Sequence, residues 1–139
     1  WQTGSYSYKK IKKQINNENI KYVKFINNIS QAYSAADIII SRAGAIAISE
    51  IAYFKKATIF IPLPSSSDNH QHINAECLIK KKACVIINQE DFVTGKLEES
   101  IKYLLSDNNA TKELENNINK FAEPNASENI ANKIINLIK

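Results

Sequence analysis

The sequence has few of the residues that fix a site by covalent bonds or special backbone geometry. Its 139 residues include three glycines, three prolines, two cysteines and no methionine. Cys77 and Cys84 match no metal-binding or redox spacing, so we interpret them as free structural thiols of a reducing compartment. No apolar run is long enough to span a bilayer and no segment has a signal-peptide pattern, so a cytosolic setting is the default expectation.

Several common catalytic signatures are also missing. The chain contains no Ser-His-Asp order, no paired carboxylates and no Walker loop. His70 and His72 could form a His-x-His metal site, but no third histidine is present in the sequence. We therefore expect neither a bound metal nor a cofactor.

Arginine is almost absent, because Arg42 is the only one and lysine supplies nearly all the positive charge. The net charge is +4 and the pI is about 9.0. Basic charge can attract an anionic membrane or a nucleic acid. The densest cluster of positive charge consists of Lys9, Lys10, Lys12 and Lys13. It has neither interleaved aromatics nor an arginine patch, so we interpret it as a solvated helix face and expect no nucleic-acid partner.

What is present is an alternation of short apolar runs with helical patterns. The hydrophobic fraction of 44% and the length suit one domain with a core of its own. Strands are predicted at 20–25, 37–40, 58–61 and 83–87, and helices at 6–17, 29–36, 45–54, 70–81, 91–105, 109–121 and 125–139. This alternation predicts an α/β fold, a Rossmann-like doubly wound parallel sheet.

The two ends of the chain carry further predictions. Ser127 is predicted to cap the last helix, with Glu128 in its first turn. Residues 1–4 have the pattern of a strand end and its turn, and no start methionine precedes them. We therefore expect 1–139 to be a fragment of a domain that lacks its first strand and helix.

The stretch from Ser41 to Glu50 is the first candidate site. A β-branched run turns into a helix through small residues and the single Gly44, which allow a ligand close to the backbone. The first N–H groups of such a helix can bind a phosphate. Six residues past Gly44, the Glu50 carboxylate could accept hydrogen bonds from a ribose diol. The alternative is an ordinary β–α turn with a solvent-facing glutamate.

The second candidate site opens the helix predicted at 70–81. His70, Gln71 and Asn74 are spaced so that all three can face one ligand. Amide groups suit sugar hydroxyls, because they both donate and accept. Ile73 and Cys77 are predicted to pack inward. The alternative is a polar helix start with Asp68 or Asn69 as its cap.

Three polar segments follow predicted strand ends, namely 25–28, 41–50 and 64–74. Ligands of such sheets bind beyond the carboxyl ends of the strands, so these segments are predicted to share one rim. Phe25 could stack on a base or belong to the core. Arg42 could bind a phosphate or hold the loop through backbone carbonyls.

Beyond these patterns, the chain closely resembles the MurG family of bacterial peptidoglycan glycosyltransferases. The likeness covers almost the whole chain, weakens after about residue 90, and is carried by 1–4, 25–28, 41–45, 49–52, 62–64 and 68–75. The resemblance implies a GT-B fold, of which this chain is the C-terminal donor-binding domain. It also implies transfer of N-acetylglucosamine from UDP-N-acetylglucosamine to lipid I, giving lipid II, by a peripheral protein on the cytoplasmic side of the inner membrane.

The resemblance also implies a role for each candidate residue. Phe25 lies against the uracil, the Ile26 backbone contacts its edge, and Glu50 holds the ribose hydroxyls. The diphosphate is held at the turn by backbone amides, with the substrate-binding set there comprising Arg42, Gly44, Ala45, Ile46 and Ala47. The sugar contacts Gln71, Asn74 and position 70, where His70 replaces the family's common glutamine.

Two parts of the family pattern are missing from 1–139. One is the Gly-Gly-Ser-Gln-Gly loop, and the other is the N-terminal domain with the acceptor site, the membrane-binding patch and the general base. The resemblance therefore implies that 1–139 is one half of a hexosyltransferase and contains no catalytic residue. This half is expected to be inactive alone, and lipid I is expected to bind through the missing domain. Two alternatives remain: a UDP-N-acetylglucosamine 2-epimerase, and a non-catalytic UDP-sugar-binding subunit of a split transferase.

Overall fold

The structure, a computed structural model, describes residues 1–138. The chain forms two compact units, of which the first comprises Trp1–Ala35 and the second begins at Ala36. Each unit is described separately below.

The first unit holds two helices, α1 (Gly4–Gln14) and α2 (Ile29–Ala35). Between them, Val23 forms an isolated parallel bridge with Gln2. The prediction of a strand over 20–25 is wrong, because only this short pairing forms there. Val23 is 42% exposed, so no neighbouring strand covers the apolar side chains that alternate along 20–25.

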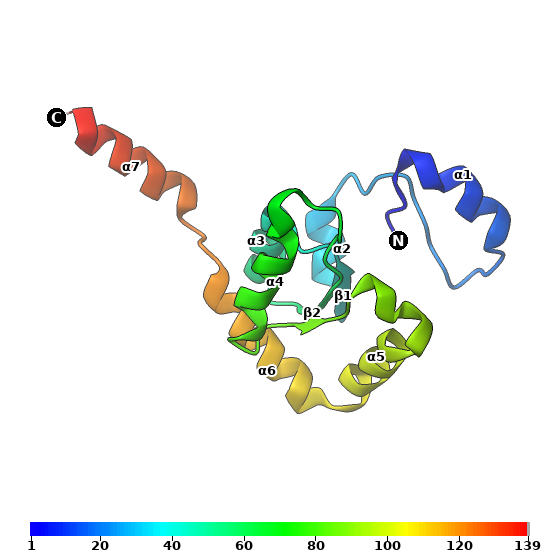
Figure 1. Cartoon of the computed structure of the whole chain (residues 1–139). Coiled ribbons are helices and arrows are strands. Elements are labelled where there is room, and N and C mark those ends of the chain that lie inside the picture. Colours follow the sequence, from blue (N-terminus) through cyan, green and yellow to red (C-terminus); the bar gives the residue numbers. More distant parts are fainter. Residues whose placement is uncertain (139) are drawn as a thin grey trace. The chain divides into compact units, whose positions relative to one another are not determined.

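The second unit is built on a parallel sheet in the order β1-β2-β3. The strands are β1 (Ile38–Ser41), β2 (Ala57–Phe60) and β3 (Val85–Ile86). Helix α3 (Ala45–Tyr53) connects β1 to β2, and α4 (His70–Ile79) connects β2 to β3. Figure 1 shows the strands in the middle of this unit, surrounded by α3, α4, α5 and α6. The predicted α/β architecture with parallel strands is confirmed.

The core lies on both faces of β2, all four residues of which are buried. Alternation along a strand sends Ile59 to one face and Thr58 and Phe60 to the other. On the first face, Ile59 clusters with side chains of α5 (Lys96–Ser106) and α6 (Asn108–Ile118). That cluster comprises Ile59, Ile87 and Leu104, with Ile38, Val85, Leu97, Ile101, Ala110 and Leu114 packed against it.

Helix boundaries in the second half differ from the prediction where local backbone geometry intervenes. The helix predicted at 91–105 is interrupted, because Gly95 adopts a left-handed φ of 80° between a 3-10 helix (Gln89–Thr94) and α5. The strand predicted at 83–87 pairs only at Val85 and Ile86. Asp107 caps α6 by accepting from the N–H groups of Asn109 and Ala110, each at 3.0 Å.

The last described helix, α7 (Ala126–Ile138), has Glu128 in its first turn as predicted. Ser127 lies inside that turn, so the prediction that it caps the helix is wrong. No residue of α7 is buried. Within residues 1–138, every helix is too short or too polar to cross a membrane.

Candidate functional site

The turn from β1 into α3 leaves the start of the helix open. Gly44 is the N-cap residue, in an extended conformation with φ −73° and ψ 143°, and no side chain caps the helix. Within residues 1–138, the N–H groups of Ala45, Ile46 and Ala47 donate no hydrogen bond. Ile46 is 78% exposed, so nothing described here covers this end of α3. Three backbone donors therefore face open space, an arrangement that attracts an anion.

Glu50 lies further along the same face of α3. It follows Ile46 by four residues and precedes Tyr53 by three, which places all three side chains on one side of the helix. Glu50 is partly buried, whereas Ile46 and Tyr53 are 78% and 58% exposed. Six residues of α-helix rise about 9 Å, so the carboxylate is roughly one nucleoside length from the helix start.

Asn74 joins α4 to the turn. Its side-chain Nδ2 donates to the Ala43 carbonyl oxygen at 3.2 Å, which fixes the orientation of the amide. Because the nitrogen faces Ala43, the Oδ1 atom of Asn74 remains as an acceptor. Helix α4 is thus held to the turn that precedes α3, at the carboxyl edge of the sheet.

The Gln71 side chain uses its amide oxygen within the fold, whereas Asn74 uses its amide nitrogen. Its Oε1 accepts a hydrogen bond from the Leu63 backbone N–H at 3.0 Å. The Nε2 group is left as a donor of two hydrogen bonds. Gln71 and Asn74, three residues apart on α4, therefore offer a donor and an acceptor respectively, which is what a pair of sugar hydroxyls requires.

His70 is held locally. Its Nδ1 lies 2.6 Å from the Ser67 carbonyl oxygen, which can only accept, so Nδ1 is the donor of this contact and Nε2 of the neutral ring is left as an acceptor. His72 is engaged elsewhere, with Nε2 3.6 Å from Glu76 Oε1. Asn69 occupies the N-cap position of α4 in a left-handed conformation, without a side-chain cap bond.

The buried face of α4 is not the one predicted. Ala75 and Leu78 are buried, whereas Ile73 is 53% exposed and Cys77 is exposed. Ile73 and Cys77 each lie two positions from Ala75, roughly 200° around the helix, so they point away from the core. The prediction that they pack inward is wrong.

Arg42 has the second of its two predicted roles. Its Nη1 donates to the carbonyl oxygens of Ile61 at 3.1 Å and Pro62 at 3.2 Å, and its Nη2 donates to Gln89 Oε1 at 2.9 Å. The guanidinium therefore holds the loop after β2 and the segment after β3. Sequence reasoning missed Gln89, although its place directly after the last predicted strand is a signal that could have found it.

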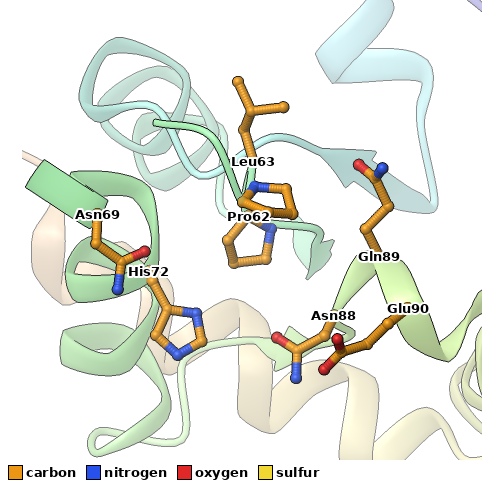
Figure 2. Close-up of a pocket in the computed structure, with 8 residues that line it drawn as sticks. Pro62, Leu63, Asn69, His72, Asn88, Gln89 and Glu90 are labelled. Atoms are coloured by element: carbon orange, nitrogen blue, oxygen red, sulfur yellow. The ribbon is translucent and has the colours of Figure 1, made fainter. Parts of the chain in front are cut away.

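A pocket of about 460 Å³ lies beside these residues, between α4 and the segments after β2 and β3. Figure 2 shows His72, Asn88 and Glu90 around the open space, with Gln89 extending away from Asn88 and Glu90. It is lined by Pro62, Leu63, Pro64, Asn69, His72, Asn88, Gln89 and Glu90. Sequence reasoning did not single out Asn88 or Glu90.

The first unit carries the two remaining candidates. Phe25 is 68% exposed, which excludes a core role within that unit. The Ile26 N–H donates to Gln2 Oε1 at 2.9 Å, so the carbonyl of Ile26 is the backbone group left for a ligand. No strand ends before Phe25, whereas 41–50 and 64–74 follow β1 and β2 and are joined through Asn74 and Ala43.

The fold and these contacts define an α/β domain of the doubly wound class, with its polar groups beyond the carboxyl ends of parallel strands. The chain belongs to the glycosyltransferase family 28 C-terminal domain family, whose pattern matches residues 1–130. The family predicted from the sequence motifs is confirmed.

Relatives from several bacteria are similar over most of the chain. The UDP-N-acetylglucosamine--N-acetylmuramyl-(pentapeptide) pyrophosphoryl-undecaprenol N-acetylglucosamine transferase of Cytophaga hutchinsonii is 37% identical over 138 residues, 99% of this chain. The protein of the same name from Rickettsia akari is 42% identical over 113 residues, 80% of this chain. The chain spans 37% and 30% of the lengths of these two relatives.

A solved structure agrees with the sequence comparison. The crystal structure of MurG from Acinetobacter baumannii is similar with a TM-score of 0.81 and 28% identity. The match covers 96% of this chain and 39% of that one. The α/β fold of this chain is therefore that of one part of a longer transferase of known structure.

Proposed function

We propose that this chain is the donor-binding part of a hexosyltransferase that moves N-acetylglucosamine from UDP-N-acetylglucosamine to lipid I, forming lipid II. The observation that carries the proposal is the joining of the open α3 start to the two oriented amides of α4, through Asn74 and Ala43. The backbone N–H groups that can donate to a diphosphate thus lie next to the amide side chains that can bind the sugar attached to it. The names of the relatives supply the identity of the nucleotide sugar.

Each part of the donor has a proposed place. The diphosphate accepts hydrogen bonds from the backbone N–H groups at the start of α3, which is also the positive end of the helix dipole. The ribose hydroxyls donate to the Glu50 carboxylate further along α3. The sugar meets Gln71 Nε2 and Asn74 Oδ1, with His70 Nε2 as a further acceptor.

The uracil is proposed to bind the first unit. Phe25 offers an exposed ring for stacking. The Ile26 N–H is already bound to Gln2, so the backbone group of Ile26 that meets the base is its carbonyl, which accepts from the uracil N3–H group. Adenine has no ring N–H that matches the N3–H of uracil, so this contact favours UDP over ADP.

The other partners of the reaction are proposed to contact protein outside these residues. Transfer requires lipid I and a general base at the sugar hydroxyl that attacks the anomeric carbon. We place the acceptor site, the base and the contact with the cytoplasmic face of the plasma membrane in the part of the transferase that this chain does not span. An epimerase would instead require catalytic acids at the sugar, where the groups proposed here are the amides of Gln71 and Asn74 and the His70 imidazole, with Glu50 assigned to the ribose.

Calorimetry with the full-length transferase tests the proposal. UDP is expected to bind at least tenfold more tightly than ADP, because one uracil contact to a fixed backbone group is lost with adenine. Equal affinities for the two nucleotides would refute the uracil assignment. Residues 1–139 alone are expected to form no lipid II from lipid I, and measurable transfer by them would contradict the division of roles.

A further inference from the structure

Arg42 connects three segments of the rim that are far apart in the sequence. It lies in the turn after β1, and its side chain donates to two carbonyls at the start of the loop after β2 and to Gln89 after β3. A planar guanidinium can bind three acceptors at fixed angles, which a lysine ammonium on a flexible stem cannot reproduce. Gln89 is 47 residues away from Arg42 in sequence.

The segment that Arg42 holds has few other backbone bonds. The ladder of the sheet ends where Ile61 N–H donates to the Ser41 carbonyl at 2.8 Å. Pro62 and Pro64 have no N–H to donate. The carbonyls of Ile61 and Pro62 both accept from Arg42, so this side chain fixes the direction in which the loop leaves β2.

The next residue of that loop orients Gln71. Leu63 N–H is the donor at 3.0 Å that turns Gln71 Oε1 toward the loop and leaves Nε2 outward. A continuous chain of contacts therefore runs from Gln89 to Arg42, to the Pro62 carbonyl, to Leu63 N–H and to the Gln71 amide.

We propose that Gln89, acting through Arg42, is a positioning residue for the sugar half of the donor site. It holds the guanidinium so that Leu63 N–H keeps the Gln71 amide nitrogen directed at the sugar. The inference rests on the proposed function and adds to it a residue outside the donor-binding motifs. Its consequence is selective, because the hydrogen bonds of the Arg42 side chain lead to Gln71, whereas the start of α3 and Glu50 are connected to Arg42 through the backbone of the turn.

The experiment compares two variants at this position in the full-length transferase. Gln89→Leu removes one of the three acceptors of Arg42 at nearly constant size, and Gln89→Glu keeps that acceptor and adds a charge partner. Gln89→Leu is expected to weaken UDP-N-acetylglucosamine binding about fivefold to tenfold, the effect of one hydrogen bond, and UDP binding less than twofold. Gln89→Glu is expected to restore sugar-nucleotide affinity. Glu99→Gln, on the exposed surface of α5 and outside the candidate site, is the control and is expected to match the wild type.

A double-mutant cycle shows whether the effect passes through Gln71. In a Gln71→Ala background, Gln89→Leu is expected to have no further effect on the affinity ratio of UDP-N-acetylglucosamine to UDP. Unchanged binding in Gln89→Leu, equal losses for both ligands, or additive losses in the double variant would each overturn the inference. A wild-type protein that binds no UDP-N-acetylglucosamine would instead refute the proposed function itself.

Discussion

The side-chain nitrogen of Asn74 lies 3.2 Å from the carbonyl oxygen of Ala43, the residue before Gly44. This bond links the turn before α3, which starts at Ala45, to α4, which starts 25 residues later at His70. A group bound at the open N–H groups of α3 is thereby next to the oriented amides of α4. The arrangement suits a ligand in which a sugar is attached directly to a diphosphate.

Truncation of the two amides should separate sugar binding from nucleotide binding. Gln71→Ala and Asn74→Ala each remove a hydrogen bond to the sugar, worth about 1 kcal/mol, or about fivefold in affinity. We expect this loss for UDP-N-acetylglucosamine and little loss for UDP, both measured by calorimetry in the full-length protein. Asn74→Ala should also lower the melting temperature slightly, because the Ala43 carbonyl loses its partner. Parallel losses for both ligands would show that the two residues support the fold rather than the sugar.

Local patterns predicted the strand, turn and helix of this site well. Strand β1 and helix α3 lie within a residue or two of their predicted ranges, because a β-branched run followed by small residues and an amphipathic segment leaves few alternatives. The predicted strand over 20–25 failed for a different reason. A strand requires neighbours along its whole length, and only residues near Gln2 lie beside Val23.

The sequence could not decide the role of Arg42. Its three acceptors lie 19, 20 and 47 residues further along the chain, and which carbonyls point at it depends on the packed loops. The same holds for the orientations of Gln71 and Asn74. Their spacing on a helix was predictable, but which atom of each amide stays available depends on Leu63 and Ala43.

Gly44 should be needed for the ligand and not for the fold. Its φ of −73° is available to any residue, and a Cβ added there meets no atom within 4 Å. Gly44→Ala is therefore expected to leave the melting temperature within about 2 °C of the wild type. UDP affinity should fall about tenfold, because the added methyl occupies space that a phosphate needs near the backbone. Unchanged UDP binding would show that no phosphate approaches this residue.

The two cysteines should differ in reactivity. Burial raises the pKa of the Cys84 thiol from 9.0 to about 12, whereas Cys77 is exposed. The thiolate is the reactive form, so a disulfide reagent at pH 8 should modify one thiol quickly in the native protein and two after unfolding. Rapid modification of both thiols in the native state would contradict the burial of Cys84.

The same shift makes stability depend on alkaline pH. The native state retains the Cys84 proton above pH 9.0, where the unfolded state loses it. This contribution is therefore complete below pH 9.0 and is lost as the pH rises toward 12, by at most about 1.4 kcal/mol per pH unit. Urea unfolding of the wild type and Cys84→Ala between pH 8 and 10.5 should show a steeper decline for the wild type, and equal slopes would contradict it.

Glu50 is expected to hold the ribose through its charge. An ionised carboxylate that accepts two hydroxyl hydrogen bonds binds more strongly than a neutral acceptor. Glu50→Gln keeps the size but loses the charge and one acceptor, so UDP binding should weaken by about 1.5–3 kcal/mol. Because Glu50 also has a contact within the fold, the free energy of unfolding is measured alongside the UDP affinity.

Comparison of UDP with 2′-deoxy-UDP distinguishes this role from a general effect on the helix. The wild-type protein should prefer UDP, since the deoxy form lacks one of the hydroxyl groups that the carboxylate binds. In Glu50→Gln that preference should be largely lost, and thermal melting of both proteins serves as the control for folding. If instead the mutant still discriminates as the wild type does, Glu50 is not the ribose ligand, and the nucleotide assignment then depends on Phe25 and the start of α3.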